Sequence, residues 1–463
     1  MEKNKVTNES VFDLEGKPPL LKCLPLSLQH ILAMIVGTVA VPIVVGSAVG
    51  VPGDQITLLV QYALITAGVA TLIQLYPLFG LGSGLPIIYG IGFTYVPTLV
   101  AVAKGYGIAS IFGAQIVAGI VTISIGLCIK RIRKYFPNIV TGTVVFTIGL
   151  SLFPVGVNYI AGGTGNANYG SLANWALATF TLAVVIGLNQ FSKGYAKLAS
   201  LFLGIMIGYA VAFVFGMVDL SPIKEAGWVA LPKPLAFGIQ FDLPVVISVA
   251  IVSIVNAIQS IGDLSATTIS GMDRDITGKE LSRGVIGSGV ATIFGSIFGG
   301  LPPSAYSQNV GIVAMNKVIS KYVFAIAGIF MLLAGFIPKF GSLMTTIPYA
   351  VLGGATMSIF SMIMMTGMRL IFTQELSSRN TIIVGLAIAL AMGITSVPEA
   401  QVLFPEFVQM VFGESPIVIA AIVAFTLNLI IPEKSLAQES KERAEMESGK
   451  KSKTKDLEKE LNS

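Results

Sequence analysis

The sequence predicts an all-α polytopic membrane protein whose fourteen transmembrane segments form two inverted repeats of seven. Three observations carry this prediction: an apolar, weakly charged composition, a regular series of apolar stretches, and two stretches interrupted by glycine and proline at matching positions. Of 463 residues, 54% are hydrophobic and 11% are charged, and the mean hydropathy is +0.82. Soluble chains carry about 25% charged residues. This composition therefore argues against a soluble enzyme and places most of the chain in lipid.

Twelve apolar stretches have about the length of 20 residues that is needed to cross the hydrocarbon core. These predicted spans cover residues 27–50, 57–79, 106–129, 138–160, 173–191, 197–217, 244–268, 284–299, 322–338, 346–371, 380–396 and 416–432. Two further stretches, 84–101 and 302–316, contain proline and glycine and are too irregular for plain spanning helices. Counting both gives fourteen crossings.

The distribution of Lys and Arg predicts that both termini are cytoplasmic, because cytoplasmic loops hold most basic residues. With fourteen crossings, 25 of the 29 basic residues fall on the inner side, including the run at 130–134 and eight residues of the tail 433–463. The polar segment 1–24 lacks the basic start and short apolar core of a cleaved signal peptide. The charged tail is expected to be a solvated appendage.

The two broken stretches resemble each other and predict an internal repeat. Residues 84–89 read GLPIIY, and residues 300–306 read GLPPSAY. Each would be the third crossing of a seven-crossing half, and an odd number of crossings inverts the second half relative to the first. Paired Gly/Pro-interrupted segments of this kind indicate a transporter binding site. A coincidental match remains the alternative, because short matches arise easily in an apolar, Gly-rich chain.

One predicted span carries a polar stripe on a single helix face, namely Asn256, Gln259, Asp263 and Thr267. Asp263 is the one carboxylate well inside a predicted span, and ionisable groups at that depth are usually functional. The alternative is that the stripe bonds a neighbouring helix. That alternative has about equal weight for Asn256 and Thr267 but less for Gln259 and Asp263, since such contacts seldom need a charge.

A second polar cluster follows Pro303 and comprises Ser304, Tyr306, Ser307, Gln308 and Asn309. The prolines prevent a regular helix start and leave backbone groups free to face a ligand. The adjacent carboxamides of Gln308 and Asn309 both donate and accept hydrogen bonds without charge. This chemistry suits a planar neutral ligand such as a nucleobase.

His30 is the only histidine and lies near the cytoplasmic start of the first span. It is either a proton relay or a packed side chain that orients a neighbour, and the second interpretation is favoured. The sequence contains no Gly-rich phosphate loop and no His/Cys cluster with metal spacing. No cofactor or metal is therefore expected, and a proton or sodium gradient would supply any energy.

Together these residues resemble the nucleobase/ascorbate transporter family, also called the uracil/xanthine permeases, over about residues 25–432. The resemblance rests on four short motifs: Gln29-His30, GIGF at 90–93, QSIGD at 259–263, and QNVG at 308–311 with Lys317. The last motif is similar to the family signature, which begins with Gln or Glu, then Asn, any residue and Gly.

The resemblance implies short strands in segments 3 and 10 that pair near the membrane centre. Segments 1–4 and 8–11 would form a core domain (25–130 and 244–340), and segments 5–7 and 12–14 would form a gate domain (131–243 and 341–432). Transport would proceed by movement of the core against the gate. The resemblance also implies a multi-pass protein of the plasma membrane in contact with lipid, a homodimer through the gate domain, and no nucleic-acid partner.

The resemblance further implies that Phe93 stacks on the base while Gln308 and Gln259 bond its opposite edges. Tyr89 and Ser307 are further substrate-binding candidates. The supporting or ion-coupling candidates are Asp263, Asn309, His30 and Asn256.

The chain departs from the family pattern at several positions. Gln259 stands where the family usually has a Glu linked to proton coupling, and an amide does not take up a proton near neutral pH. Ser288 stands where some xanthine carriers have Asp, Asn316 replaces the signature Thr, and Tyr89 occupies a place often held by Gln. We therefore expect either coupling through Asp263 or weak or absent proton coupling.

The expected function is secondary active transport of a nucleobase, and Gln308 favours a purine such as xanthine or uric acid over uracil. Two alternatives remain: a uracil permease of the same family, and a sulfate or bicarbonate carrier of the same fold. An enzyme is not expected, because the buried polar residues form no catalytic triad or metal ligand set.

Overall fold

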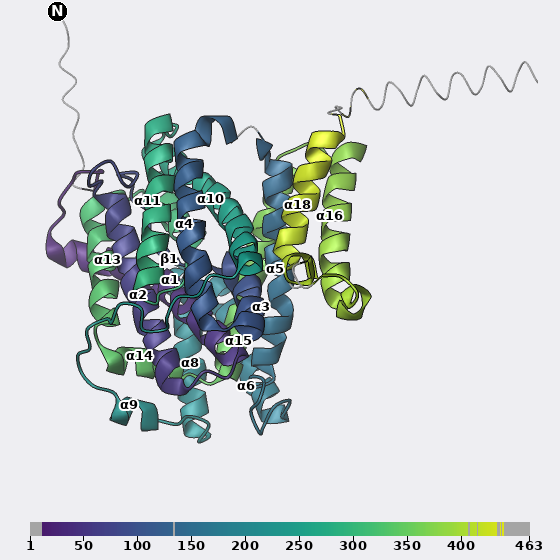
Figure 1. Ribbon diagram of the computed structural model, residues 1–463. Coiled ribbons are helices and arrows are strands. Elements are labelled where there is room, and N and C mark those ends of the chain that lie inside the picture. The colour runs from purple at the N-terminus through teal and green to yellow at the C-terminus, as the bar shows by residue number, and fades with distance from the viewer. Residues whose placement is uncertain are drawn as a thin grey trace, which may run out of the picture.

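The computed structural model describes residues 12–132, 135–405, 408–413 and 415–432, together with residues 436 and 438. Its described part is a bundle of helices that encloses one two-stranded sheet (Figure 1). The expectations for residues 1–11, for residues 133–134 of the basic run and for nearly all of the tail fall outside the described residues.

The first half of the described chain contains two long helices, a strand with a short helix behind it, and a further series of helices. These elements are α1 (Leu20–Ala48), α2 (Gly53–Leu75), β1 (Tyr89–Ile91), η1 (Phe93–Tyr95), α3 (Val96–Tyr106), α4 (Ile108–Ile132), α5 (Asn138–Ile160), α6 (Leu172–Phe191), α7 (Tyr195–Leu198), α8 (Ser200–Val214) and α9 (Ser221–Glu225).

The second half repeats this order of two long helices followed by a strand and a short helix. Its elements are α10 (Leu243–Met272), α11 (Gly278–Ile297), β2 (Pro303–Ala305), α12 (Ser307–Asn316), α13 (Lys321–Gly335), α14 (Pro338–Thr345), α15 (Tyr349–Phe372), α16 (Ser378–Ser396), η3 (Pro398–Gln401), η4 (Gln409–Gly413) and α18 (Pro416–Ile430).

Eight helices of the described part are long and apolar enough to cross a membrane: α1, α2, α4, α5, α6, α10, α15 and α16. The pair α13 and α14, bent by 87°, would make a ninth span, and α8 and α18 are shorter apolar helices. The chain is therefore a multi-pass membrane protein. The end of α18 lies at the upper end of the bundle in Figure 1, and α9 and α14 lie towards the lower end.

Several predicted spans differ in detail from the helices. The predicted span 197–217 is divided between α7 and α8, and the span 57–79 ends at Leu75, just before Pro77. The span 322–338 ends at Gly335, and the chain turns into α14 at Pro338, which lacks the N–H that would continue α13. Proline positions account for two of these three differences.

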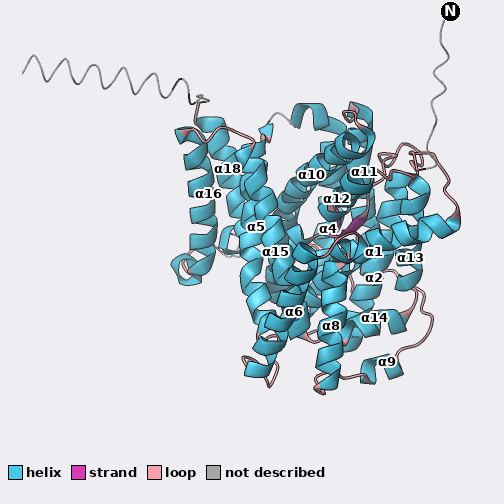
Figure 2. Ribbon diagram, turned by 180° about the vertical axis from the view of Figure 1, so that it is seen from behind, coloured by secondary structure: helices cyan, strands magenta, loops and turns pink. Residues whose placement is uncertain are grey.

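β1 and β2 are 3 residues each and pair antiparallel, although they lie in different halves of the chain. Figure 2 shows this strand pair in magenta, surrounded by helices. All six residues are buried. Because each strand directly precedes a short helix, the pair sets the positions at which η1 and α12 begin.

Close helix packing is achieved through facing glycines. A Cβ added to Gly119 of α4 would meet the carbonyl oxygen of Gly289 on α11 at 2.8 Å, and one added to Gly289 would meet that of Gly119 at 2.6 Å. Gly142 of α5 and Gly367 of α15 face each other in the same reciprocal way. Small residues let membrane helices approach closely, so these pairs fix the α4–α11 and α5–α15 contacts.

Candidate substrate site

The strand pair positions the two short helices, η1 and α12, that carry residues of the candidate site. Tyr89 pairs with Ala305, Gly90 with Ser304 and Ile91 with Pro303. Beyond the strands, the N–H of Gly92 donates to the carbonyl of Pro302, and that of Tyr306 donates to the carbonyl of Ile88, both at 3.1 Å. The backbone just before α12 is therefore held by the residue that precedes β1, and the backbone just before η1 is held by the residue that precedes β2.

The ring of Tyr306 lies against two glycines. A Cβ on Gly37 of α1 would meet the Tyr306 hydroxyl oxygen at 2.5 Å, and a Cβ on Gly90 would meet Cε2 of the same ring at 2.5 Å. The hydroxyl donates to the carbonyl oxygen of Ile91 at 3.0 Å. Glycine is thus required at both positions for Tyr306 to pack here.

Ser307, the first residue of α12, joins this helix to α10. Its hydroxyl donates to Oδ1 of Asp263 at 2.6 Å. Asp263 is 8% exposed, and its Oδ2 has no partner among the described residues. The start of α12 also brings the partial positive charge of a helix N-terminus to this point. The carboxyl group of Asp263 is thus held at one oxygen and available at the other.

Gln259 lies one turn before Asp263 on α10, and its Oε1 accepts a hydrogen bond of 3.0 Å from the hydroxyl of Thr94. Thr94 belongs to η1 and is 4% exposed. The Gln259 side chain is half-buried, as is that of Gln308 on α12. No described residue is hydrogen-bonded to the carboxamide of Gln308. Two carboxamides with unused hydrogen-bonding groups therefore stand on adjacent helices.

Phe93 lies at the start of η1 and is 7% exposed. Its ring packs edge-on against Phe360 of α15, with ring centroids 5.5 Å apart and an interplanar angle of 78°. This contact joins the strand region to a helix of the α5–α15 group. Access to the face of Phe93 therefore depends on the position of α15.

The remaining candidate residues, Tyr89, Asn256, Asn309 and His30, bond or pack within the protein interior. Tyr89 is fully buried, and its hydroxyl faces Ser260, Asp263 and Ser288. Asn256 donates to the carbonyl oxygen of Pro303 at 3.3 Å, so it ties α10 to β2. This is the interhelical type of contact that was the alternative interpretation of the polar stripe.

Thr267, the last residue of the stripe, donates to the carbonyl oxygen of Asp263 within its own helix at 2.8 Å. Asn309 bonds His30 on α1. The structure thus joins α10 to η1 through Gln259 and Thr94, and to α12 through Asp263 and Ser307, with Gln259 and Asp263 one turn apart.

Two residues of this region, Thr94 and Phe360, were not predicted from the sequence. Thr94 carries a usable signal, because it is a polar residue directly after the GIGF motif in an apolar stretch. Phe360 carries none, since it is one of 26 phenylalanines and its contact with Phe93 depends on the tertiary fold.

The arrangement offers two neutral carboxamides, an aromatic ring and one carboxyl group. Carboxamides recognise ligands that have both N–H and C=O groups, and an aromatic ring favours a flat ligand. Within the described residues, no group of three or more His, Cys, Asp or Glu could hold a metal ion. The region is suited to binding a planar, polar, neutral or weakly anionic molecule.

Two solved structures share this fold. The transmembrane domain of the bicarbonate transporter BicA from a cyanobacterium aligns with a TM-score of 0.56 and 17% identity, covering 88% of this chain and 98% of that one. The murine anion transporter Slc26a9 in the inward-facing state aligns with a TM-score of 0.59 and 12% identity, covering 89% of this chain and 69% of that one. At these identities the likeness concerns the fold alone.

The sequence comparisons identify the family. Residues 21–400 match a model described as "Permease family". A xanthine permease of Bacillus subtilis is 34% identical over 433 residues, or 92% of this chain and 97% of that protein. The uric acid permease PucK of the same organism is 36% identical over 88% of this chain and 95% of its own length, and the xanthine permease XanQ of Escherichia coli is 30% identical over 93% and 95%. These relatives are permeases and not enzymes, and this chain belongs to their family, the nucleobase/ascorbate transporters.

Proposed function

We propose that this chain transports a purine base such as xanthine or uric acid across the membrane. The observation that carries the proposal is the pair of half-buried carboxamides, Gln259 and Gln308, on the contacting helices α10 and α12, with Gln259 bonded to the residue after Phe93. Xanthine and uric acid carry alternating N–H and C=O groups on a flat ring, which such side chains recognise. The names of the aligned relatives, which include xanthine and uric acid permeases, support the same substrate class.

In this proposal the transporter has fourteen segments in two inverted repeats. The equivalent helices are α1 and α10, α2 and α11, α4 and α13, α5 and α15, α6 and α16, and α8 and α18. Helix contacts support it, because they come in pairs that this exchange interconverts. The contact of α2 with α13 corresponds to that of α11 with α4, the contact of α1 with α13 to that of α10 with α4, and the contact of α6 with α8 to that of α16 with α18.

The same contacts support a division into core and gate. Helix α2 packs mainly with α13, α4 packs mainly with α11 and α10, and α1 packs with α2 and α13, whereas α5 packs mainly with α15 and α6 packs with α15 and α8. We assign 25–130 and 244–340 to the core, and 131–243 and 341–432 to the gate. Transport then consists of alternating access, in which the core moves against the gate and the Phe93–Phe360 contact opens and closes.

In this proposal Phe93 stacks on the base, Gln259 and Gln308 bond its edges, and Ser307 fixes Asp263 beside them. Tyr89 supports α10 from behind, because its side chain is fully buried. Asn256, Asn309 and His30 hold β2 and α12 in place.

Ion coupling, if present, uses Asp263, the one carboxyl group in this region. The experiment is uptake into proteoliposomes with an imposed proton or sodium gradient. Asp263→Asn should abolish acceleration by the gradient, and retention of full gradient-driven uptake would contradict this role. Gln259→Glu should make uptake more dependent on pH, because it adds a second group that can be protonated.

The protein lies in the plasma membrane with both termini cytoplasmic, and the gate domain forms a homodimer. The positive-inside distribution of basic residues supports the orientation. Lys224 of α9 and Lys339 of α14 belong to the short elements towards the lower end of Figure 1, away from the end of α18. Cysteine labelling of either end in inverted vesicles tests the orientation.

Thermal-shift measurements on purified protein test the substrate. A ligand raises the melting temperature as its concentration exceeds its dissociation constant. Xanthine or uric acid should stabilise the protein at lower concentration than uracil, hypoxanthine or ascorbate. Stabilisation by uracil alone would assign a uracil permease, and stabilisation by bicarbonate or sulfate alone would assign an anion carrier.

A further inference from the structure

Thr94 holds the carboxamide of Gln259 by its oxygen. The Thr94 hydroxyl donates to Oε1 of Gln259 at 3.0 Å, and Thr94 is 4% exposed. The backbone around Thr94 is fixed on both sides: the N–H of Gly92 donates to Pro302, and the N–H of Tyr95 donates to the carbonyl of Gly92 at 3.3 Å. The donor that reaches Gln259 therefore comes from a backbone anchored by the strand region.

This contact gives the carboxamide a direction. A carboxamide has one acceptor end and one donor end, and its two ends exchange by rotation about the terminal bond. A hydroxyl can donate or accept, and here the Thr94 hydroxyl donates to the acceptor end of Gln259. When Oε1 is bonded to Thr94, the two N–H groups of Nε2 point elsewhere. No described residue accepts a hydrogen bond from Nε2 of Gln259. Both N–H groups are therefore available to a ligand.

We propose that Thr94 fixes Gln259 as a hydrogen-bond donor, so that the site selects purine bases with a carbonyl oxygen, and rejects those with an amino group, at the edge facing α10. The inference rests on the proposed transport of a purine and specifies which groups of the base are read. An amino group of the base at this edge would face the N–H groups of Gln259. Both groups only donate, so the donors of the base and of the protein would stay without an acceptor.

A carboxylate at position 259 would have the opposite preference. It only accepts hydrogen bonds, and its two oxygens are equivalent, so Thr94 would have no orientation to fix. The effect of Thr94 on selectivity therefore depends on the residue at 259 being a carboxamide. This dependence separates an orienting role of Thr94 from a general effect on packing.

The test compares dissociation constants of three bases for purified protein. Xanthine has carbonyl groups at C2 and C6, guanine replaces the C2 carbonyl by an amino group, and isoguanine replaces the C6 carbonyl. Either guanine or isoguanine presents its amino group to α10. Wild-type protein should bind that base at least about 10-fold more weakly than xanthine, since polar sites discriminate strongly against a mismatched hydrogen-bonding group. The ratio of these two dissociation constants is the selectivity ratio.

Thr94→Val removes the hydroxyl but keeps the shape of the side chain. It should reduce that selectivity ratio by about 10-fold, because the freed carboxamide can rotate to accept from an amino group. Thr94→Ser keeps the hydroxyl and should retain the wild-type ratio. Thr122→Val is the matched control, because Thr122 is also buried and its hydroxyl donates at 2.9 Å to the carbonyl of Ala118 within α4.

Gln259→Glu should reverse the preference towards the base with the amino group, and Thr94→Val should then change the ratio little. The inference is wrong if Thr94→Val keeps the wild-type ratio, if Thr94→Ser loses it, or if Thr94→Val has the same effect on the Gln259→Glu protein. Should Thr94→Val not fold, Thr94→Ala, which also removes the hydroxyl, takes its place in both comparisons. Failure of wild-type protein to bind any of the three bases would instead overturn the proposed function.

Discussion

Asn309 on α12 bonds His30 on α1 through a single nitrogen. Its Nδ2 lies 3.0 Å from Nδ1 of the His30 ring and 3.0 Å from the His30 backbone carbonyl oxygen. Because an amide nitrogen only donates, Nδ1 accepts, and the ring proton lies on Nε2. Both residues are almost completely buried. The lone histidine therefore holds the helix that carries Gln308 against α1.

We expect His30→Leu to lower both ligand affinity and stability. The substitution leaves one N–H of Asn309 without its acceptor in a buried place, which costs about 1–3 kcal/mol. His30→Asn should restore most of the loss, because its side-chain oxygen can occupy the place of Nδ1. Melting temperature and the dissociation constant for xanthine measure both effects. Equal losses in the two variants would show that the acceptor at this position does not matter.

Gly90→Ala should displace the ring of Tyr306, which packs against Gly90. A Cβ at Gly90 would collide with the Tyr306 ring and with Thr38 and Met34 of α1. Overpacking of this kind costs about 1–3 kcal/mol, and displacement of Tyr306 would shift the start of α12. We expect a lower melting temperature and weaker binding.

Gly105→Ala on α3 is the matched control, since a Cβ there meets nothing within 4 Å. It should leave both quantities nearly unchanged. A Gly90→Ala protein as stable as the Gly105→Ala protein would contradict the packing assigned to Tyr306.

The broken segments could be predicted because their chemistry is local. Pro86, Pro302 and Pro303 cannot take part in regular helix hydrogen bonding, and the strands begin within a few residues of them. Helix ends were less predictable where they depend on contacts. α1 begins at Leu20 and not near residue 27, and half-exposed residues such as Leu24 extend it beyond the apolar stretch.

The pairings inside the site could not be predicted, because they join residues far apart in sequence. Thr94 and Gln259 are 165 residues apart, and Asn309 and His30 are 279 residues apart. The polar stripe on α10 indicated which residues share a face, but not which element each one contacts. Asn256 bonds β2, Gln259 bonds η1 and Asp263 bonds α12.

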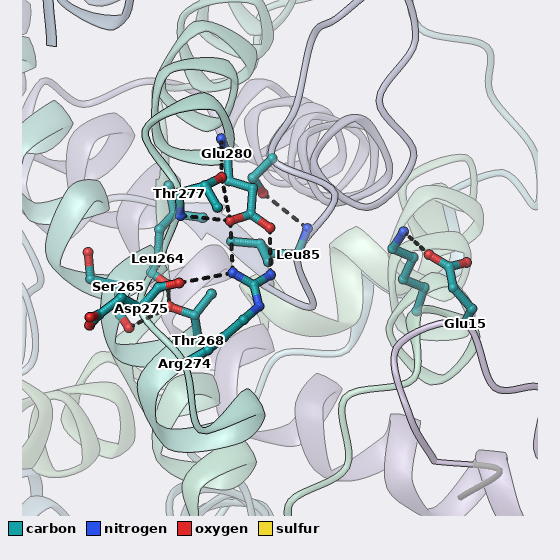
Figure 3. Close-up of polar contacts among 11 residues, drawn as sticks. Glu15, Leu85, Leu264, Ser265, Thr268, Arg274, Asp275, Thr277 and Glu280 are labelled. Atoms are coloured by element: carbon teal, nitrogen blue, oxygen red, sulfur yellow. Dashed lines mark hydrogen bonds and ion pairs between the residues drawn. The ribbon is translucent and has the colours of Figure 1, made fainter. Parts of the chain in front are cut away.

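Glu280 should contribute stability that depends on pH. It lies at the start of α11, where its carboxylate accepts hydrogen bonds from Arg274 and Thr277 (Figure 3). Burial alone would raise the pKa of Glu280, but the bonds from Arg274 and Thr277 lower it to about 2, below the ordinary value of 4.5. The charged form is therefore favoured by folding. Its stabilising effect is complete above pH 4.5 and disappears as the pH falls towards 2.

Glu280→Gln keeps an acceptor for the helix cap but removes the charge. We expect it to lower the melting temperature at pH 7, and the difference from wild type should narrow between pH 4.5 and pH 3. Glu225→Gln, at an exposed position on α9, is the control, and it should change the melting temperature little between pH 7 and pH 3. A difference that stays constant over this range would exclude the ionic contribution of Glu280.

The segment before α1 lies along the linker between α12 and α13. The N–H groups of Ile319 and Lys321 donate to the carbonyl oxygens of Phe12 and Leu14 at 3.1 and 3.0 Å. The hydroxyl of Ser320 donates to the carbonyl of Gly16 at 2.6 Å. The side chains of Phe12 and Leu14 also pack against the apolar core. This linker follows the helix that carries Gln308, so the segment stabilises the end of α12 indirectly.

Amide hydrogen exchange tests this contact. Replacing Phe12 and Leu14 by Ser should accelerate exchange at Ile319 and Lys321 by about 5-fold, because a hydrogen bond that contributes about 1 kcal/mol protects an amide by roughly that factor. Ser320→Ala should have a smaller effect in the same direction, and Ser358→Ala on α15 should have none.

Glu15→Gln should also change exchange little, although Glu15 forms an ion pair with Lys321 (Figure 3). The Glu15 side chain is 77% exposed, and ion pairs at such positions contribute about 0–1 kcal/mol. Protection of the linker should therefore follow the backbone bonds and the burial of Phe12 and Leu14, and not the charge. Equal acceleration of exchange by Glu15→Gln and by the double substitution would show that the ion pair contributes as much protection as the backbone bonds. Fast exchange at Ile319 and Lys321 in wild-type protein would show that the segment does not hold the linker.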